Sequence, residues 1–442
     1  MKNVTLPDSV DELGASAFKG CTSLEKISGT SGLSEIKEYT FQDCRVLSVF
    51  PDLSGVTSIG QYAFSGCSSL TSAGFGSGVT SIGAYAFSDC SSLLATPDLS
   101  EVTTIGEGAF ANCTLLTDIE GLDGSGSLGE AIFRACENIA KLTVNFRTQV
   151  EQFYVSKLFE KRTSGEIDAS YDIVKISDSV YYAVPKSLVT LEMSGQSEIP
   201  SYFAYGMTSL QSFNNTSGSS SVGEHSFDGC SNLASTGLGS TVTSIASYAF
   251  SNCSSLAQFS FLKNVSTIGE FAFNGCSSMT SIPSFASLAS IGESAFLGCS
   301  SLSALDLGNT IETIGANAFT GCYSLTSLSV PDSVVSIGNG ALSGCYGLSS
   351  LTLPFVGTSS DSLQDFAVIF GTSSFAGSYS ATESSGTYYV PNALTTVSVH
   401  KGKIAAKAMP LTAVRLCFRF RLTMPFLPLG IMPLTVAHCF PT

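Results

Sequence analysis

Residues 313–334 read TIGANAFTGCYSLTSLSVPDSV, and this stretch decides the fold. Leu325, Leu328 and Val330 alternate with polar residues at the end of an L-x-x-L-x-[LV] pattern. That pattern predicts a short strand with one buried face. Pro331 ends the strand because proline has no N–H to donate to a neighbouring strand. Residues 335–338 predict a second, shorter extended segment.

A tight turn is predicted at residues 318–322, which read AFTGC. We expect it to carry Phe319 and Cys322 into the interior of the protein. A coil made of two short strands and one turn is too small to bury its apolar side chains alone. The stretch therefore predicts a fold in which several such coils stack on one another.

The same stretch recurs with a step of 23 residues. The cysteines follow it at Cys21, Cys44, Cys67, Cys90, Cys113 and Cys136, and again at Cys230, Cys253, Cys276, Cys299, Cys322 and Cys345. The phenylalanines follow it from Phe18 to Phe133 and from Phe227 to Phe319. A fixed period of this size is typical of a solenoid. We predict that equivalent residues stack on each other, with neighbouring strands about 4.8 Å apart.

The repeated pattern I-G-x-x-A-F-x-G-C-x-S-L-x-x-[LIV] resembles the BspA-type leucine-rich repeats of surface proteins from bacteria and some protists. The resemblance covers about residues 4–141 and 199–352. It implies a β-rich, curved, right-handed solenoid with 23-residue repeats, short parallel strands on its concave face and little helix. Family members are non-enzymatic and several are adhesins. The resemblance thus implies a cell-surface or secreted protein that binds protein ligands, such as host or extracellular-matrix proteins.

The 23-residue step fails twice, which divides the chain into predicted regions. We expect about six repeats in 1–141, an insertion with a strand excursion in 142–198, about seven repeats in 199–352, and a second, related insertion in 353–403. The insertions are related because YYAVP at residues 181–185 matches YYVP at residues 388–391. Each insertion is either a spacer or brace, or a loop that binds a ligand.

Residues 404–442 form an aberrant tail without the repeat pattern. Two blocks in it, 409–415 and 432–438, resemble each other and lie 23 residues apart. In a reading frame moved back by one base, both blocks can encode Ala-Phe-Asn-Gly-Cys-Ser, in which only the alanine is forced. We hypothesise that the tail is two further repeats translated out of frame. A basic, apolar membrane anchor is the competing interpretation, but prolines and arginines interrupt every apolar run of about 20 residues.

The start of the chain also departs from a complete solenoid. Residues 1–10 begin within a repeat, and no signal peptide is visible. We therefore expect a fragment, or a start assigned too far downstream.

The composition limits the partners of the protein. The net charge is −15, from 20 basic and 35 acidic residues, which argues against nucleic acid because that ligand requires a basic surface. Each cysteine of the repeats occupies a slot that Met207 fills in one copy, so we predict buried free thiols. The spacing alone also allows disulfides between cysteines of neighbouring coils, so this alternative stays open. Zinc is not expected, because ligands in a line cannot surround an ion tetrahedrally.

The sequence carries little catalytic chemistry. It has three histidines, and His225 occupies a variable slot that we interpret as surface. There is no G-x-S-x-G elbow and no phosphate-binding loop. Glu107, Glu130, Glu270 and Glu293 share one slot, which predicts a solvated face or, as the alternative, a divalent-cation site. We predict no enzyme, no cofactor, no metal site and no membrane span.

The outward slot two residues after the repeat leucine forms the predicted concave face. It is small, mostly neutral and polar, without the aromatic cluster of a tight sugar site or the convergent titratable groups of catalysis. We predict a protein-binding face, and a structural stalk that displays another domain is the alternative function. The candidate ligand-binding residues are Lys26, Val49, Ser72, Asp118, Lys141, Ser212, Ser235, Gln258, Ser281, Ser327 and Ser350.

Overall fold

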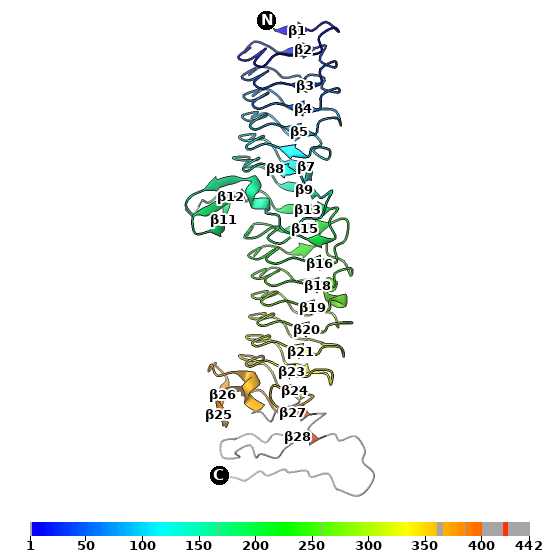
Figure 1. Cartoon of the computed structure of the whole chain (residues 1–442). Coiled ribbons are helices and arrows are strands. Elements are labelled where there is room, and N and C mark those ends of the chain that lie inside the picture. The colour runs from blue at the N-terminus through cyan, green and yellow to red at the C-terminus, as the bar shows by residue number, and fades with distance from the viewer. Residues whose placement is uncertain are drawn as a thin grey trace. The chain divides into compact units, whose positions relative to one another are not determined.

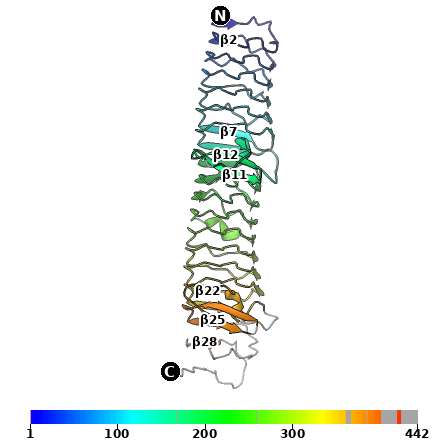
Figure 2. The ribbon, with the colours of Figure 1, turned by 90° about the vertical axis from the view of Figure 1, so that its left-hand side faces the viewer.

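The structure, a computed structural model, describes residues 2–166, 168–257, 259–359, 366–383, 385–399 and the backbone of 419–422. The chain forms two compact units. Unit 1 holds residues 1–219 and 229–237, and unit 2 holds residues 220–228 and 238–442. Within each unit, the coils are successive layers (Figures 1 and 2). Most of the tail predicted at 404–442, together with Gln258, His400 and His438, lies outside the described residues.

Unit 1 contains two parallel ladders, one on each side of the coils. The first, here called the Ile ladder, joins the Ile-Gly segments in the order β3-β4-β5-β6-β8. Each pairing advances by 23 residues, as in Ile59 with Ile82. These strands are β3 (Glu35–Ile36), β4 (Ser58–Ile59), β5 (Ser81–Ile82), β6 (Thr104–Ile105) and β8 (Ser127–Leu128). The predicted second extended segment of the repeat therefore forms a continuous ladder.

The other ladder of unit 1, the Leu ladder, joins the strands that follow the repeat leucine in the order β17-β15-β13-β9-β7. They are β7 (Asp118–Asp123), β9 (Lys141–Asn145), β13 (Thr190–Ser194), β15 (Ser212–Asn215) and β17 (Ser235–Thr236). β1 (Asn3–Thr5) and β2 (Lys26–Ser28) pair in the same way. Between β2 and β7 the ladder is reduced to the isolated bridge Ala95–Asp118. Proline at 51 and 97 removes an N–H donor there, which weakens the pairing.

Unit 2 repeats this arrangement. Its Ile ladder joins β16 (Ser221–Val222), β18 (Ser244–Ile245), β19 (Thr267–Ile268), β20 (Ser290–Ile291), β21 (Thr313–Ile314) and β23 (Ser336–Ile337). Its Leu ladder joins β22 (Ser327–Ser329), β24 (Ser350–Leu353), β27 (Thr396–Val399) and β28 (Arg419–Leu422). All these pairs are parallel, and helix among the described residues is limited to three short 3-10 segments. The predicted solenoid with 23-residue repeats and little helix is confirmed.

The turn of each repeat also connects neighbouring coils. In the coil of residues 60–67, Phe64 N–H donates to Ala86 O at 2.7 Å and Gly66 N–H donates to Ser88 O at 2.8 Å. Tyr62 and Gly66 have φ angles of 54° and 74°, which type II turns require at their third position. Every second N–H of the turn thus reaches the next coil. We call this third side of the coil the turn face.

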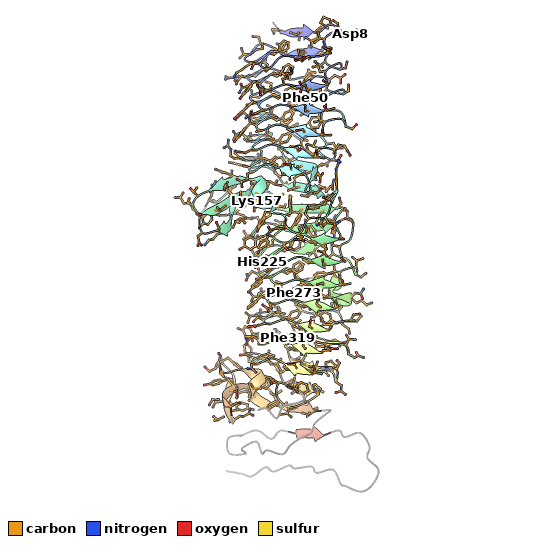
Figure 3. All side chains as sticks on the ribbon, viewed as in Figure 1. Asp8, Phe50, Lys157, His225, Phe273 and Phe319 are labelled. Atoms are coloured by element: carbon orange, nitrogen blue, oxygen red, sulfur yellow. The ribbon has the colours of Figure 1, made fainter. Side chains whose placement is uncertain are left out.

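The core consists of columns of identical residues. Phe87 is fully buried, and its ring centroid lies 5.3 Å from that of Phe64 and 5.2 Å from that of Phe110. Phe273 and Phe319 occupy the same column in unit 2 (Figure 3). The predicted stacking of phenylalanine on phenylalanine is therefore found in both units.

The cysteines of the repeats form a second column beside the phenylalanines. All twelve are free, and all except Cys21 are buried. Cys90 Sγ lies 3.3 Å from Phe64 O, to which it donates, and Cys345 Sγ lies 3.2 Å from Phe319 O. Burial raises the pKa of both thiols to about 12. The column therefore packs as an apolar element of the core with weak hydrogen bonds to the backbone.

The region 142–198 combines coil residues with a projecting sheet. The 3-10 segment η1 (Val155–Leu158) takes the place of a turn, because Ala131 N–H donates to Lys157 O and Val155 N–H donates to Phe203 O. The chain then leaves the coil as β10 (Glu160–Arg162), β11 (Tyr171–Ser177) and β12 (Val180–Pro185), an antiparallel sheet in the order β10-β12-β11. Figure 1 shows β11 and β12 beside the coils of unit 1.

Unit 2 contains a related excursion. The segment η3 (Phe366–Phe370) accepts hydrogen bonds from the preceding turn, where Leu342 N–H donates to Ile369 O at 2.8 Å. The antiparallel pair β25 (Ser378–Glu383) and β26 (Gly386–Pro391) follows it. The similar sequences of the two insertions thus fold into similar local structures, each a 3-10 segment followed by antiparallel strands. The remaining 3-10 segment, η2 (Ser260–Asn264), belongs to an ordinary coil of unit 2.

Candidate functional site

The predicted ligand-binding face lies on the outer side of the Leu ladders. Each unit holds a part of it, with Lys26, Val49, Ser72, Asp118, Lys141, Ser212 and Ser235 in unit 1 and Ser281, Ser327 and Ser350 in unit 2. Gln258 lies outside the described residues. Lys141, Ser212 and Ser350 are half-buried, and the others described are exposed. These residues are aligned within each unit.

In unit 1 the register aligns four of these residues, together with Thr190, in one row. Asp118 pairs with Lys141, Lys141 with Thr190, Thr190 with Ser212, and Ser212 with Ser235. Lys141 Nζ lies 2.9 Å from Glu192 Oε2, and this hydrogen bond raises the pKa of the lysine. The row therefore presents its charges and hydroxyls at fixed positions on paired strands.

The same side of unit 1 exposes apolar side chains. The exposed fraction is 46% for Val49 and 56% for Leu94, which lies next to the outward slot of its own coil. Exposed aliphatic residues beside a polar row provide the mixed character of protein-binding surfaces.

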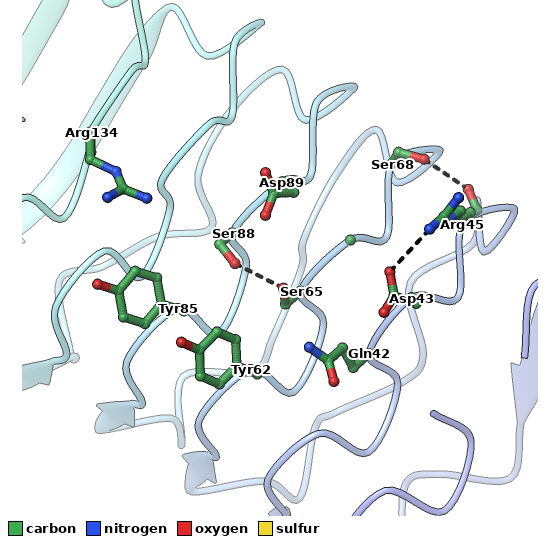
Figure 4. Close-up of a pocket in the computed structure, with 11 residues that line it drawn as sticks. Gln42, Asp43, Arg45, Tyr62, Ser65, Ser68, Tyr85, Ser88, Asp89 and Arg134 are labelled. Atoms are coloured by element: carbon green, nitrogen blue, oxygen red, sulfur yellow. Dashed lines mark hydrogen bonds and ion pairs between the residues drawn. The ribbon is translucent and has the colours of Figure 1, made fainter. Parts of the chain in front are cut away.

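The turn face of unit 1 carries a groove that sequence reasoning missed (Figure 4). Its volume is about 760 Å³, and its eleven lining residues include no aliphatic side chain. They are Gln42, Asp43, Arg45, Tyr62, Ser65, Gly66, Ser68, Tyr85, Ser88, Asp89 and Arg134. The lining contains two carboxylates and two guanidinium groups, so the groove has no net charge.

One wall of the groove is formed by Tyr62 and Tyr85, which belong to a ladder of stacked tyrosines. Ring centroids lie 5.3 Å apart for Tyr39 and Tyr62 and 5.1 Å apart for Tyr62 and Tyr85, with nearly parallel planes. Tyr85 OH donates to Glu107 Oε1 at 2.5 Å, which raises the pKa of the tyrosine. The ladder ends at Gly108, where an added Cβ would overlap the Tyr85 ring. The 23-residue spacing of these tyrosines was the signal in the sequence that could have revealed the ladder.

The floor of the groove consists of small residues that leave space between the walls. Ser65 and Ser88 are almost fully buried, and Ser88 Oγ lies 2.9 Å from Ser65 Oγ, to which it donates. Asp89 Oδ1 accepts a hydrogen bond of 2.8 Å from Asn112 Nδ2. At the ends, Gln42 Oε1 is buried without a hydrogen-bond partner, and Arg134 is exposed.

In unit 1, the predicted row of glutamates forms hydrogen bonds with other side chains of the protein. Glu107 accepts from Tyr85, and Glu130 contacts both Lys161 Nζ at 2.9 Å and Tyr182 OH at 3.1 Å. The hydrogen bond from Lys161 lowers the pKa of Glu130. Within the described part of the chain, no group of three or more metal-ligating side chains is positioned to hold an ion. These contacts give the glutamates structural roles.

His225 contributes to packing in unit 2. Its ring stacks on Tyr248 with centroids 4.6 Å apart, and its Nδ1 lies 2.8 Å from Asp228 Oδ2. Tyr248 stacks in turn on Phe271 at 4.9 Å. His225 thus continues an aromatic ladder at the slot that holds Tyr62 and Tyr85 in unit 1.

The projecting sheet of unit 1 is fastened to coils on both of its sides. Asp172 is buried and accepts from Thr208 Oγ1 and from Ser209 N–H, both at 2.7 Å. Tyr171 OH donates to Glu137 Oε1 at 2.7 Å. These contacts hold the projecting sheet against the coils of unit 1.

Comparison with known proteins supports the assignment of the fold. A family profile described as "BspA type Leucine rich repeat region (6 copies)" matches residues 1–97, 94–198, 197–322 and 273–367. A search of curated proteins found no match. No described helix is long and apolar enough to cross a membrane.

Several solved structures are similar to the chain. A leucine-rich repeat protein from Bacteroides ovatus is 27% identical, with 80% of this chain and 87% of that chain covered and a TM-score of 0.48. A leucine rich cell surface protein from Faecalibacterium prausnitzii is 20% identical, with coverage of 85% and 92% and a TM-score of 0.29. The pneumococcal vaccine antigen PcpA is 15% identical, with coverage of 90% and 84% and a TM-score of 0.29. Because the family profile matches most of its length, the chain belongs to the BspA-type leucine-rich repeat family.

Proposed function

We propose that the chain is a non-catalytic binding module, cell-surface or secreted, that engages protein ligands such as host or extracellular-matrix proteins through the outer side of its Leu ladders. The observation that carries the proposal is the row Asp118, Lys141, Thr190, Ser212 and Ser235, held in register on five paired strands of unit 1. A row fixed by backbone hydrogen bonds loses little conformational entropy when a partner binds.

The chemistry of this face suits a protein surface better than a small substrate. It combines short polar side chains, the Lys141–Glu192 ion pair and the exposed aliphatic residues Val49 and Leu94. A stable protein interface buries about 800 Å² on each partner, which requires an extended surface. Exposed apolar residues at its centre would contribute most of the affinity.

Surface location is supported by family membership and by the similar Faecalibacterium prausnitzii protein, which is described as a cell surface protein. A non-catalytic role is supported by the structural roles of His225 and the glutamate row, whose side chains contact other residues of the protein.

The proposal is tested by retention of the full chain on a panel of purified extracellular-matrix proteins. We expect the double variant Val49→Glu/Leu94→Glu to weaken retention by about tenfold or more, because it places charges in the apolar part of the face. Val335→Glu is the matched control, since Val335 is 51% exposed and adjoins the Ile ladder of unit 2. Failure of every matrix protein to retain the chain would contradict the proposal and favour a stalk.

A further inference from the structure

We propose that the turn-face groove of unit 1 is a second binding site and that its ligand is a neutral, hydroxyl-rich chain, that is, an oligosaccharide. The groove lies on a different side of the coils from the Leu ladder, so the proposal does not depend on protein binding there. Four observations carry it: the shape of the groove, its charge balance, the buried unpaired Oε1 of Gln42 and the absence of apolar anchors from its lining.

The shape of the groove suits an elongated ligand. Gln42, Ser65, Ser88 and Arg134 occupy the same slot of different coils, so the lining follows the direction in which coils stack. Each coil adds about 4.8 Å in that direction. In Figure 4 the tyrosines line one side, and Asp43, Arg45 and Ser68 lie at the far end from Arg134. A trough of this form can hold several linked units of a polymer.

The polar groups of the groove call for a ligand that both donates and accepts hydrogen bonds. Gln42 Oε1 is a buried acceptor without a donor, and Asp43 and Asp89 present further acceptors. Arg134 presents donors at the opposite end and forms no ion pair with a described carboxylate. A hydroxyl group can donate and accept at once, whereas ammonium groups only donate and carboxylates only accept. Two acidic and two basic side chains balance, which favours a neutral ligand.

A peptide strand is a poorer fit for the same groove. The turn N–H groups of Phe64 and Gly66 already donate to Ala86 O and Ser88 O, so they cannot pair with an added strand. The lining has no aliphatic pocket in which a peptide side chain could be anchored. The tyrosine rings stack on one another, so they present hydroxyls and edges to the groove. Hydrogen bonding therefore dominates recognition.

The test is a calorimetric titration of the full chain with neutral hexasaccharides of glucose, xylose and mannose. We expect at least one to bind, and Asp89→Asn/Arg134→Gln to weaken that binding by about tenfold or more, since hydrogen bonds to charged groups are among the stronger ones. Both residues are exposed, and asparagine tolerates the φ of 61° at position 89, so the variant keeps the fold.

Asn252→Asp is the matched control, because Asn252 occupies the slot of Asp89 in unit 2 with a φ of 60°. It should bind the sugar as the unmodified chain does. The proposal is overturned if none of the neutral hexasaccharides binds, if only anionic polysaccharides bind, or if the groove variant binds as tightly as the unmodified chain. Retention on matrix proteins is measured in parallel, and its loss or survival does not bear on this outcome.

Discussion

The two units build the same aromatic ladder on the turn face, but the surroundings differ. In unit 1, Tyr39, Tyr62 and Tyr85 stack above a floor of Ser65 and Ser88. In unit 2, His225, Tyr248 and Phe271 stack beside Asp228, Ser251 and Asn274.

The larger floor residues of unit 2 bond to their neighbours. Asp228 pairs with His225, and Asn274 Nδ2 lies 3.5 Å from Ser251 Oγ. The backbone turns are the same in both units, with positive φ at the ladder slot. The repeat therefore fixes the backbone frame in both units, while the side chains at two or three outward slots differ between them.

The largest expected effect is a difference in stability between a variant of the core and a variant of the turn face. Phe87→Ala removes a buried ring that stacks on Phe64 and Phe110, and should lower the stability of unit 1 by about 3–5 kcal/mol. Tyr85→Ala removes a ladder ring nearby and should cost about 1 kcal/mol. Thermal unfolding and hydrogen exchange of both variants measure the difference. Equal losses would show that the ladder belongs to the core.

The second effect concerns the cysteine column, which both units share. An unfolded thiol ionises near pH 8.5, whereas burial raises the pKa of Cys90 and Cys345 to about 12. Below about pH 8.5 the thiol is protonated in both the folded and the unfolded state, and the stability of the protein is fully present. As pH rises from there towards 12, only the unfolded thiol ionises, so the free energy of unfolding falls by up to about 1.4 kcal/mol per pH unit for each thiol. Stability measured between pH 8 and 11 should therefore fall in both units.

Cys90→Ala provides the control for that measurement. It removes one titrating thiol and should flatten the alkaline decline by the contribution of a single group. A decline of unchanged slope would mean that the thiols do not cause it.

The third effect tests where the unit 1 ladder ends. Gly108 has a φ of 58°, and a Cβ there would overlap Cε1 of the Tyr85 ring. Gly108→Ala should therefore destabilise unit 1 by roughly 1–2 kcal/mol through strain and the displaced ring. Ser294 occupies the same slot after Phe271 in unit 2, so Ser294→Gly should be nearly neutral. Denaturant unfolding measures both, and a neutral Gly108→Ala would place the Tyr85 ring elsewhere.

The smallest effect lies at the other end of the ladder. Lys19 Nζ is 4.8 Å from the centroid of the Tyr39 ring. Lys19→Met keeps the length of the side chain and removes its charge, which should cost about 0.5 kcal/mol. The melting temperature at low and high salt checks this: a loss that is the same at both salt concentrations would contradict a charge–ring contact.

The sequence predicted those features of the fold that depend on the 23-residue period. Phe87, Cys90 and Leu93 recur because each must stack on its equivalent, so the coil, the parallel register and the buried thiols followed from spacing. The period also marked the two insertions as related, through the similar letters before Pro185 and Pro391. The Ile ladder was expected only as a short extended segment, yet it is the more continuous ladder between residues 35 and 128.

The features that sequence reasoning missed depend on contacts between different slots. The groove exists because Ser65 and Ser88 are small beside the rings of Tyr62 and Tyr85, and no single column of the repeat shows this. Asp172 binds Thr208 and Ser209 across 36 and 37 residues, outside any 23-residue register. Outward side chains carry no packing constraint, so their partners could not be read from the period.

One measurement tests the central claim, that separate faces on one repeated frame carry separate recognition. The full chain, Val49→Glu/Leu94→Glu and Asp89→Asn/Arg134→Gln are each assayed against immobilised matrix proteins and neutral hexasaccharides. We predict that the first variant loses the protein ligand and keeps the sugar, while the second keeps the protein ligand and loses the sugar. Loss of both ligands in either variant, or of neither in both, would contradict the account.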